Sequence, residues 1–250
     1  MRLDKFLSER TPHSRSTVKK LISAGKITVN GSSAVKADMN VTENDSITVE
    51  GTPVRTARTL TLLLNKPAGF ISATEDKAEK TVIDLLPEEF QNQNLAPAGR
   101  LDKDTTGFLI LTNDGDLLHK LTSPKKHVPK YYSALLARPF TEEAAQQLSE
   151  GIKLRDGTLC KPAEAAAYSR DGRQVLISIS EGKYHQVKRM MAAAGNHVEK
   201  LHRIGCGELL LPADLKEGEC IVLSDNDLCK LLKSGTVFSA LFQTLRKTSS

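Results

Sequence analysis

One short segment combines an arginine, an aspartate and a turn-prone Thr-Thr-Gly sequence. It reads Gly99-Arg100-Leu101-Asp102-Lys103-Asp104-Thr105-Thr106-Gly107. Arg100 is close enough in sequence to keep the Asp102 carboxylate ionised, because a nearby opposite charge favours the charged form. An ionised carboxylate held in one place can act as a nucleophile or as a base. Taken alone, the segment also fits an ordinary turn whose aspartate accepts backbone N–H groups, so its meaning depends on the rest of the chain.

Two other segments carry groups that could complete a site around Asp102. Lys130-Tyr131-Tyr132 lies in a basic stretch without acidic residues, and a tyrosine can stack on a base or exchange a hydrogen bond. Glu181 to Met191 reads as a turn followed by a strongly basic helix. A structural interpretation stays open for both, with the tyrosines packed in a strand and the basic side chains on a solvated helix face.

Basic residues are concentrated in three parts of the chain. The net charge is only +5, yet residues 1–36 hold eight Lys or Arg against Asp4 and Glu9. The stretches 120–138 and 183–203 are also rich in Lys and Arg. Separate basic clusters on a nearly balanced chain favour a polyanionic partner, so we expect nucleic acid binding.

The composition also predicts several absences. The four cysteines form no C-x-x-C pair and no zinc-like pattern with histidine, which indicates free thiols in a reducing compartment. No apolar run is long enough to cross a bilayer, and the chain does not start as a signal peptide does. We therefore expect a cytoplasmic protein without disulfides, metal, cofactor or membrane partner.

The first fifty residues predict a small unit of two helices and a few short strands. Ser14 or Ser16 can cap the second helix, and Gly25 ends it. Asn30-Gly31 is a strong hairpin signal. The expected elements are helices from Arg2 to before Pro12 and from Ser14 or Ser16 to Gly25, and strands over 26–31 and 45–49.

The remaining chain predicts a larger α+β domain. Residues 51–58 show no periodicity and read as a linker, and a domain over 59–233 follows. Helices and strands mix there without regular alternation, which favours a mixed, largely antiparallel sheet. The tail 234–250 could dock as an amphipathic helix or stay disordered. The expected elements are strands over 59–67, 108–112, 131–136 and 175–179, and helices over 81–86, 116–121 and 184–194.

The N-terminal unit resembles the alpha-L RNA-binding domain over residues 1–50. The resemblance lies in the opening Arg2-Leu3-Asp4-Lys5-Phe6-Leu7, the Ser14-Arg15-Ser16 helix start and the hairpin 25–31. It implies that the second helix and its flanks lie against structured RNA. The implied phosphate contacts are Arg15, Lys19, Lys20 and Lys26. Such contacts position an RNA without reading its sequence.

The larger domain resembles the ribosomal-RNA pseudouridine synthases, most closely the branch acting on 16S small-subunit rRNA. The resemblance rests on the segment 99–107, Thr112-Asn113-Asp114-Gly115, Lys130-x-Tyr132 and the segment 181–190, in this order. It implies the pseudouridine synthase fold and conversion of a uridine to pseudouridine. It also implies that the target base leaves its stack, at a cost of a few kcal/mol.

The same resemblance implies roles for individual residues. Asp102 would be the essential carboxylate, and the sequence leaves open whether it attacks the sugar or removes a sugar proton. Arg100 would fill the gap left by the flipped base or steady the RNA. Tyr132 would stack on the uracil and assist proton removal from carbon 5. Lys188 would pair with Asp102.

Three further residues are implied to contact the substrate. Arg189 is the alternative partner of Asp102, His185 would position groups or contact RNA, and Leu201 would pack against the base. The expected partner is ribosomal RNA, free or in a partly assembled subunit, bound by a monomer. Two alternatives stay open, namely the same reaction on 23S rRNA and a catalytically silent assembly factor. A glycosidic hydrolase fits less well, since no second carboxylate is placed as the usual pair.

Overall fold

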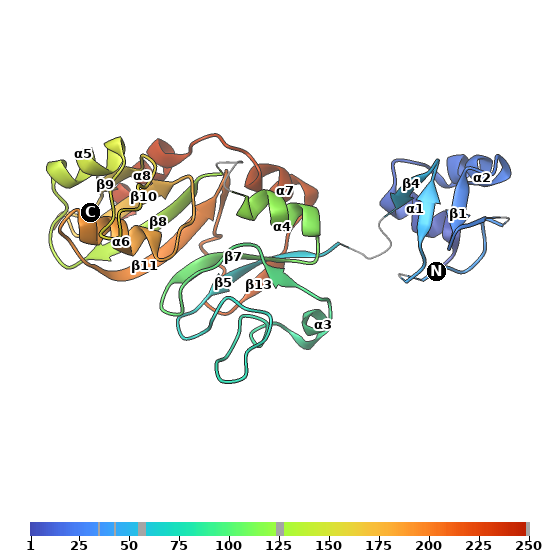
Figure 1. Cartoon of the computed structure of the whole chain (residues 1–250), viewed down its shortest axis with the longest axis horizontal. Coiled ribbons are helices and arrows are strands. Elements are labelled where there is room, and N and C mark those ends of the chain that lie inside the picture. Colours follow the sequence, from blue (N-terminus) through green and yellow to red (C-terminus); the bar gives the residue numbers. More distant parts are fainter. Residues whose placement is uncertain (35, 43, 55–58, 124–127, 249–250) are drawn as a thin grey trace. The chain divides into compact units, whose positions relative to one another are not determined.

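The computed structural model describes the chain apart from residues 35, 43, 55–58, 124–127 and 249–250. The chain divides into two compact units, Met1–Thr59 and Leu60–Ser250, which we call the first and second units (Figure 1). Each is described by itself. Part of the expected linker, 55–58, and part of the second basic stretch, 124–127, lie outside the described residues.

The first unit packs two helices against a four-stranded antiparallel sheet. The second helix starts where Ser14 accepts a hydrogen bond from the Thr17 N–H at 3.2 Å. Val18 and Ile22, four residues apart, face the core of this unit. The elements are α1 (Leu3–Arg10), α2 (Arg15–Ser23), β1 (Ile27–Val29), β2 (Ser32–Ser33), β3 (Ile47–Val49) and β4 (Thr52–Val54), with sheet order β2-β1-β3-β4. Strand β4 falls where the sequence predicts a linker, because 52–54 pair with β3.

The second unit is built on a nine-stranded sheet. Its main order is β13-β5-β7-β11-β8-β10-β9, with β6 beside β7 and β12 beside β11. Neighbouring strands are antiparallel except β7 and β11, so the mixed, largely antiparallel sheet is confirmed. The strands are β5 (Thr61–Lys66), β6 (Ala96–Pro97), β7 (Thr106–Thr112), β8 (Lys130–Leu136), β9 (Glu164–Ala167), β10 (Gln174–Ile179), β11 (Val198–Cys206), β12 (Leu209–Leu210) and β13 (Cys220–Val222).

The parallel junction of β7 and β11 brings the loop before β7 to the middle of the sheet. The two strands pair only at His202 with Thr106 and at Arg203 with Gly107. Gly107 has φ +100°, and a Cβ there would lie 2.2 Å from the Arg203 carbonyl oxygen. Buried Arg203 donates from Nε to the Phe108 carbonyl at 2.6 Å. A glycine at 107 is therefore required for the two strands to meet.

Helices cover both faces of the sheet, so the side chains of Tyr131 and Tyr132, which are neighbours on β8, pack against different helices. Tyr132 belongs to the core that includes residues of α5 (Glu142–Glu150) and α6 (Gln186–Ala193). Tyr131 packs with Phe238 of α8 (Phe238–Thr248), which the tail forms. The Tyr131 hydroxyl also accepts the Val237 N–H at 3.1 Å. The tail is thus docked. The remaining helices are α3 (Glu88–Gln91), α4 (Gly115–Thr122) and α7 (Asp225–Leu231).

Several other elements differ from the sequence-based expectations. Residues 81–86 form turns rather than a helix, because the Asp84 carboxylate accepts the Thr81 N–H at 2.7 Å. Helix α6 begins at Gln186 rather than at residue 184, since His185 is left-handed with φ 48°. Strand β11, in the middle of the sheet, is not among the predicted elements. Among the described residues, no helix could span a membrane and no cluster of His, Cys, Asp or Glu could hold a metal.

Candidate active site

A buried lysine fastens the loop that carries Asp102. Lys66, at the end of β5, has no exposed surface. Its ammonium donates to the carbonyl oxygens of Pro67 at 2.9 Å, Asp102 at 3.2 Å, Lys103 at 3.3 Å and Thr105 at 2.9 Å. One side chain therefore binds the carbonyl groups of Asp102 and of two residues that follow it, which limits how far the loop can move.

Two residues that follow β5 in the sequence, Gly69 and Ser72, make further hydrogen bonds to the same loop. The buried Ser72 hydroxyl donates to the Leu101 carbonyl at 2.9 Å and accepts the Leu101 N–H at 3.0 Å. The Gly69 N–H donates to the Lys103 carbonyl at 2.8 Å. The backbone of the loop is thus hydrogen-bonded on both sides of Asp102, which fixes the position from which its side chain extends.

Burial lowers the pKa of Lys66 to about 8, against the opposing attraction of Asp104 and Asp102. This residue is absent from the sequence-based site. A lysine at the end of the apolar run Thr61 to Lys66, directly before a proline, was the signal available in the sequence. Charged side chains are rarely fully buried without partners, and the four carbonyl groups explain this one.

The Asp102 carboxylate meets two basic side chains from the segment 185–188. His185 Nε2 lies 3.3 Å from Asp102 Oδ1, and Lys188 Nζ lies 3.2 Å from Asp102 Oδ2. Lys188 also binds Asp104 Oδ1 at 2.5 Å. The predicted pairing of Lys188 with Asp102 is therefore present in the structure, with Asp104 as a second partner that the sequence analysis did not foresee.

The charges of this cluster support one another. Partial burial alone would lower the pKa of Lys188, but its hydrogen bonds to Asp104 and Asp102 outweigh burial and raise it. The hydrogen bond from Lys188 in turn lowers the pKa of Asp104. Lys188 thus stays protonated near neutral pH and provides a positive charge beside the Asp102 carboxylate.

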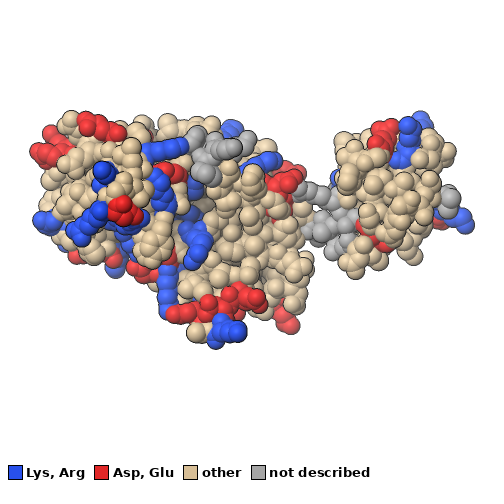
Figure 2. Space-filling model, in the orientation of Figure 1, with Lys and Arg blue, Asp and Glu red and all other residues tan. Residues whose placement is uncertain are grey.

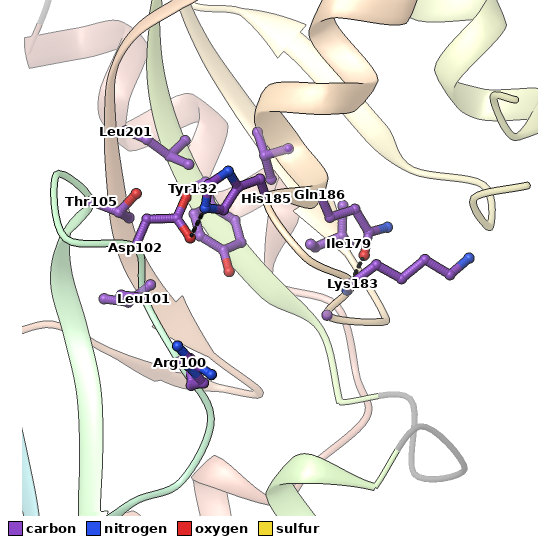
Figure 3. Close-up of a pocket in the computed structure, with 12 residues that line it drawn as sticks. Arg100, Leu101, Asp102, Thr105, Tyr132, Ile179, Lys183, His185, Gln186 and Leu201 are labelled. Atoms are coloured by element: carbon purple, nitrogen blue, oxygen red, sulfur yellow. Dashed lines mark hydrogen bonds and ion pairs between the residues drawn. The ribbon is translucent and has the colours of Figure 1, made fainter. Parts of the chain in front are cut away.

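The Asp102 side chain lines a pocket where β7, β11 and β8 meet. Figure 3 shows the carboxylate beside the His185 ring, with Tyr132 and Leu201 close to both. Tyr132 comes from β8 and Leu201 from β11, so strands distant in sequence bring them to the loop. The full lining is Arg100, Leu101, Asp102, Thr105, Tyr132, Ile179, Gly182, Lys183, His185, Gln186, Val187 and Leu201.

Arg100 and Arg189 are placed differently from the expectation. Arg100 is exposed at the pocket, and among the described residues the Asp102 carboxylate is contacted by His185 and Lys188, not by Arg100. The expectation that Arg100 holds Asp102 ionised is therefore wrong for this structure. Arg189 pairs with Asp156, so it is not the alternative partner of Asp102. The neighbouring Lys188, one position earlier on α6, faces the carboxylate instead.

The predicted phosphate-binding residues lie in the first unit. Arg15, Lys19 and Lys20 belong to α2, and Lys26 directly precedes β1. All four are exposed, while the apolar side of α2 is buried in the core of the unit. In the second unit, Lys and Arg side chains also gather on one face (Figure 2).

Comparisons with known proteins identify both units. The family model described as RNA pseudouridylate synthase matches residues 60–193, and the S4 domain model matches residues 1–47. The S4 match falls on the segment for which the sequence predicts an RNA-binding module.

Whole-length relatives agree with these matches. An uncharacterized RNA pseudouridine synthase of Bacillus subtilis, YtzG, is 43% identical over 91% of this chain and 97% of its own. The ribosomal small subunit pseudouridine synthase A of Escherichia coli K12 is 37% identical over 93% of this chain and 100% of its own. A crystal structure of a pseudouridylate synthase is 37% identical with a TM-score of 0.66, over 92% of this chain and 99% of that one. The chain therefore belongs to the RNA pseudouridylate synthase family and is an isomerase with an N-terminal S4 domain.

Proposed function

We propose that this enzyme converts one uridine of 16S ribosomal RNA to pseudouridine, with Asp102 as the essential carboxylate. The observation that carries the catalytic part is the hydrogen-bonded loop that holds Asp102 at the pocket, with its carboxylate in contact with His185 and Lys188. The preference for small-subunit RNA rests on relatives named ribosomal small subunit pseudouridine synthase A, at about 37% identity over their whole length.

The reaction conserves all atoms of the nucleotide. The bond between the ribose C1′ and the uracil N1 breaks, the base turns, and a bond forms between C1′ and C5. The proton on C5 is lost and N1 gains one. Asp102 starts this sequence, by attack on the sugar or by removal of a sugar proton, and either route needs the carboxylate to be ionised. The neighbouring Lys188 ammonium supports that state.

The other pocket residues receive the base once it has left its stack. The Tyr132 ring, on β8, stacks on the uracil and its hydroxyl assists proton removal from C5, while Leu201 packs on the apolar side of the base. Arg100, exposed at the pocket, fills the space vacated by the flipped uridine or holds the displaced RNA. His185 orients the carboxylate through its contact with Asp102 Oδ1.

The first unit holds the RNA through its backbone. Arg15, Lys19, Lys20 and Lys26 contact phosphates and position the substrate without reading its sequence. The proposal includes action as a monomer in the cytoplasm, on free RNA or on a partly assembled subunit. Incubation of the purified protein with a free 16S transcript and with the same transcript carrying ribosomal proteins tests which substrate form it accepts.

Pseudouridine mapping tests the proposed function directly. We expect a single pseudouridine of 16S rRNA to be missing from cells that lack this gene. Restored wild-type protein returns it, while the Asp102→Asn variant does not. A pseudouridine missing from 23S rRNA instead would assign the other subunit. Unchanged maps of both RNAs would indicate a silent binding or assembly factor.

A further inference from the structure

Tyr184 is the one tyrosine of this chain that the structure leaves in solvent. The sequence contains four tyrosines, and Tyr131, Tyr132 and Tyr168 are at most 9% exposed. Tyr184 is 75% exposed. Its ring makes no part of any core cluster among the described residues. A single exposed aromatic residue is ordinary on a protein surface. What distinguishes Tyr184 is its ordered position next to His185 of the pocket.

The ring is nevertheless held in place. Tyr184 stacks on His185, with ring centroids 3.8 Å apart and an interplanar angle of 17°. The left-handed backbone of His185 ends the turn before α6, and Arg189 donates to the Tyr184 carbonyl at 3.3 Å. An exposed side chain that is already ordered loses less conformational entropy when it binds a ligand.

The turn that carries Tyr184 is also anchored from inside the protein. Buried Gln186 accepts the Lys183 N–H at 2.8 Å and donates to buried Glu181 at 2.7 Å. These contacts hold the turn together, and the Lys161 N–H, which donates to Glu181 at 3.0 Å, links it to another part of the second unit. The segment 182–185 is therefore a rigid support for the exposed ring rather than a loose loop.

The stack starts at the catalytic carboxylate and leads outward. His185 Nε2 is 3.3 Å from Asp102 Oδ1, and His185 lines the pocket. The Tyr184 ring lies against the face of the imidazole, and most of the tyrosine surface is open to solvent. A uridine in the pocket would thus have its neighbours in the RNA strand near an ordered aromatic surface.

We propose that the Tyr184 ring is a stacking platform for a nucleobase next to the uridine that enters the pocket. This inference rests on the proposed function. Removing a uridine from its stack leaves the adjacent base without a partner on one side, and an aromatic ring replaces that partner. Stacking on tyrosine accepts any base, so the platform adds affinity and strand register rather than sequence reading.

Substitution of Tyr184 distinguishes a stacking platform from a role in which Tyr184 only supports the His185 side chain. With a 16S rRNA transcript as the probe, Tyr184→Ala weakens binding about 5- to 100-fold, and Tyr184→Phe binds like the wild type because the ring remains. The loss appears in Kd and KM. A loss confined to kcat, with unchanged Kd, would show that Tyr184 only orients His185 and would overturn the platform.

A fluorescence experiment reports stacking itself. The chain contains no tryptophan, so Tyr184→Trp introduces a single indole at the platform. We expect the transcript to quench this indole strongly. A matched Val222→Trp variant, with the indole at an exposed position of β13, controls for general quenching. Equal quenching of the two indoles would contradict the platform.

A substrate change completes the test once the modified uridine is mapped. An RNA fragment with an abasic residue beside that uridine loses the stacking partner. At one of the two positions, 5′ or 3′ of the uridine, the abasic residue should weaken RNA binding by the wild type by the same factor as the Tyr184→Ala substitution. At that position it should not weaken RNA binding by the Tyr184→Ala variant any further. If the abasic residue and the Tyr184→Ala substitution weaken RNA binding additively at both positions, the stacking platform is contradicted. Isomerisation by the wild type is measured separately, so failure of the platform and failure of the proposed function are distinguished.

Discussion

The two units use basic side chains in opposite ways. In the first unit, Lys19 and Lys20 are exposed on α2, and the apolar side of the helix forms the core. In the second unit, Lys66 is fully buried among carbonyl oxygens and Lys188 is bound to two carboxylates. The same residue type thus provides a surface charge in one unit and fixed geometry in the other.

The difference follows from solvent access. An exposed cation keeps its hydration, is screened by salt, and contributes to RNA affinity by releasing counterions from phosphates. A buried cation loses hydration and needs polar partners in defined positions, so it orders the groups around it. We therefore expect substitutions in the first unit to change affinity and its salt dependence. Substitutions around Asp102 should change catalysis or stability.

The largest expected effect is the loss of catalysis in Asp102→Asn. Asparagine keeps the shape of the side chain but cannot be ionised, so isomerisation should fall by about 10⁴-fold or more, as for other essential catalytic groups. RNA binding should stay within about threefold of wild type, because binding rests mainly on phosphate contacts. Single-turnover kinetics and filter binding measure the two quantities.

Asp104→Asn is the matched control for Asp102. Asp104 also binds Lys188, at 2.5 Å, but its side chain is 73% exposed. Its loss should reduce the rate by no more than about tenfold, the effect of one exposed charge near the site. Equal losses in the two variants would mean that the negative charge of the cluster matters and that Asp102 has no special role.

The next largest effect concerns the buried lysine. Lys66→Met leaves the carbonyl groups of the Asp102 loop without their shared donor, and it should lower the free energy of unfolding by about 3 kcal/mol and reduce kcat. Lys103→Met is the control. The Lys103 pair with Glu79 is exposed, so its removal should cost less than about 1 kcal/mol. Urea unfolding measures both, and similar costs would refute the fastening role of Lys66.

The difference in stability between the wild type and the same variant, Lys66→Met, should depend on pH. The pKa of Lys66 is lowered to about 8 in the folded chain, from 10.5 for an ordinary lysine. Between these values the unfolded chain holds this proton and the folded chain has released it, so the stability contribution of Lys66 rises with pH. The difference in unfolding free energy between wild type and Lys66→Met should therefore increase by up to about 1.4 kcal/mol per pH unit above pH 8. A constant difference from pH 7 to 10 would contradict it.

The smallest expected effect lies in the first unit. Replacing both Lys19 and Lys20 with Gln removes two exposed charges from α2. The slope of log affinity for 16S rRNA against log salt should become shallower by about two, since each lost phosphate contact contributes about one. The Lys→Arg double variant keeps the charges and should keep the slope. An unchanged slope in the Gln variant would place the RNA contacts elsewhere.

Local patterns in the sequence predicted much of both units. The Asn30-Gly31 hairpin and the helix beginning near Ser14 are present in the structure. The segment around Asp102, together with Tyr132 and Lys188, identified the candidate site and the pairing with Lys188. Such signals depend on neighbours within a few positions, or on motifs whose order along the chain is specific.

Other features escaped because their partners are distant. Strand β11 contains the charged Arg203, which reads as a surface residue until Phe108 of β7 supplies a buried carbonyl. In the sequence, Lys66 is indistinguishable from an ordinary residue at the end of a strand. Its buried role depends on the loop 102–105, which supplies its hydrogen-bond acceptors. The turn at 81–86 has a different cause, since the hydrogen bond from the Thr81 N–H to Asp84 is local but hydrophobic periodicity does not report it.

By itself the sequence determined the family, the two units and the carboxylate that we propose for catalysis. These can be recognised from the local spacing of residues and from the order of motifs along the chain. The tertiary structure decided how the loop around that carboxylate is held. Lys66 lies 36 positions before Asp102 and donates to its backbone carbonyl, and the order and register of β5, β7, β11 and β8 bring these elements together. It also decided that Tyr184 stays in solvent beside His185 while the other tyrosines are buried. Burial and long-range pairing arise only when the strands assemble, so no local pattern specifies them.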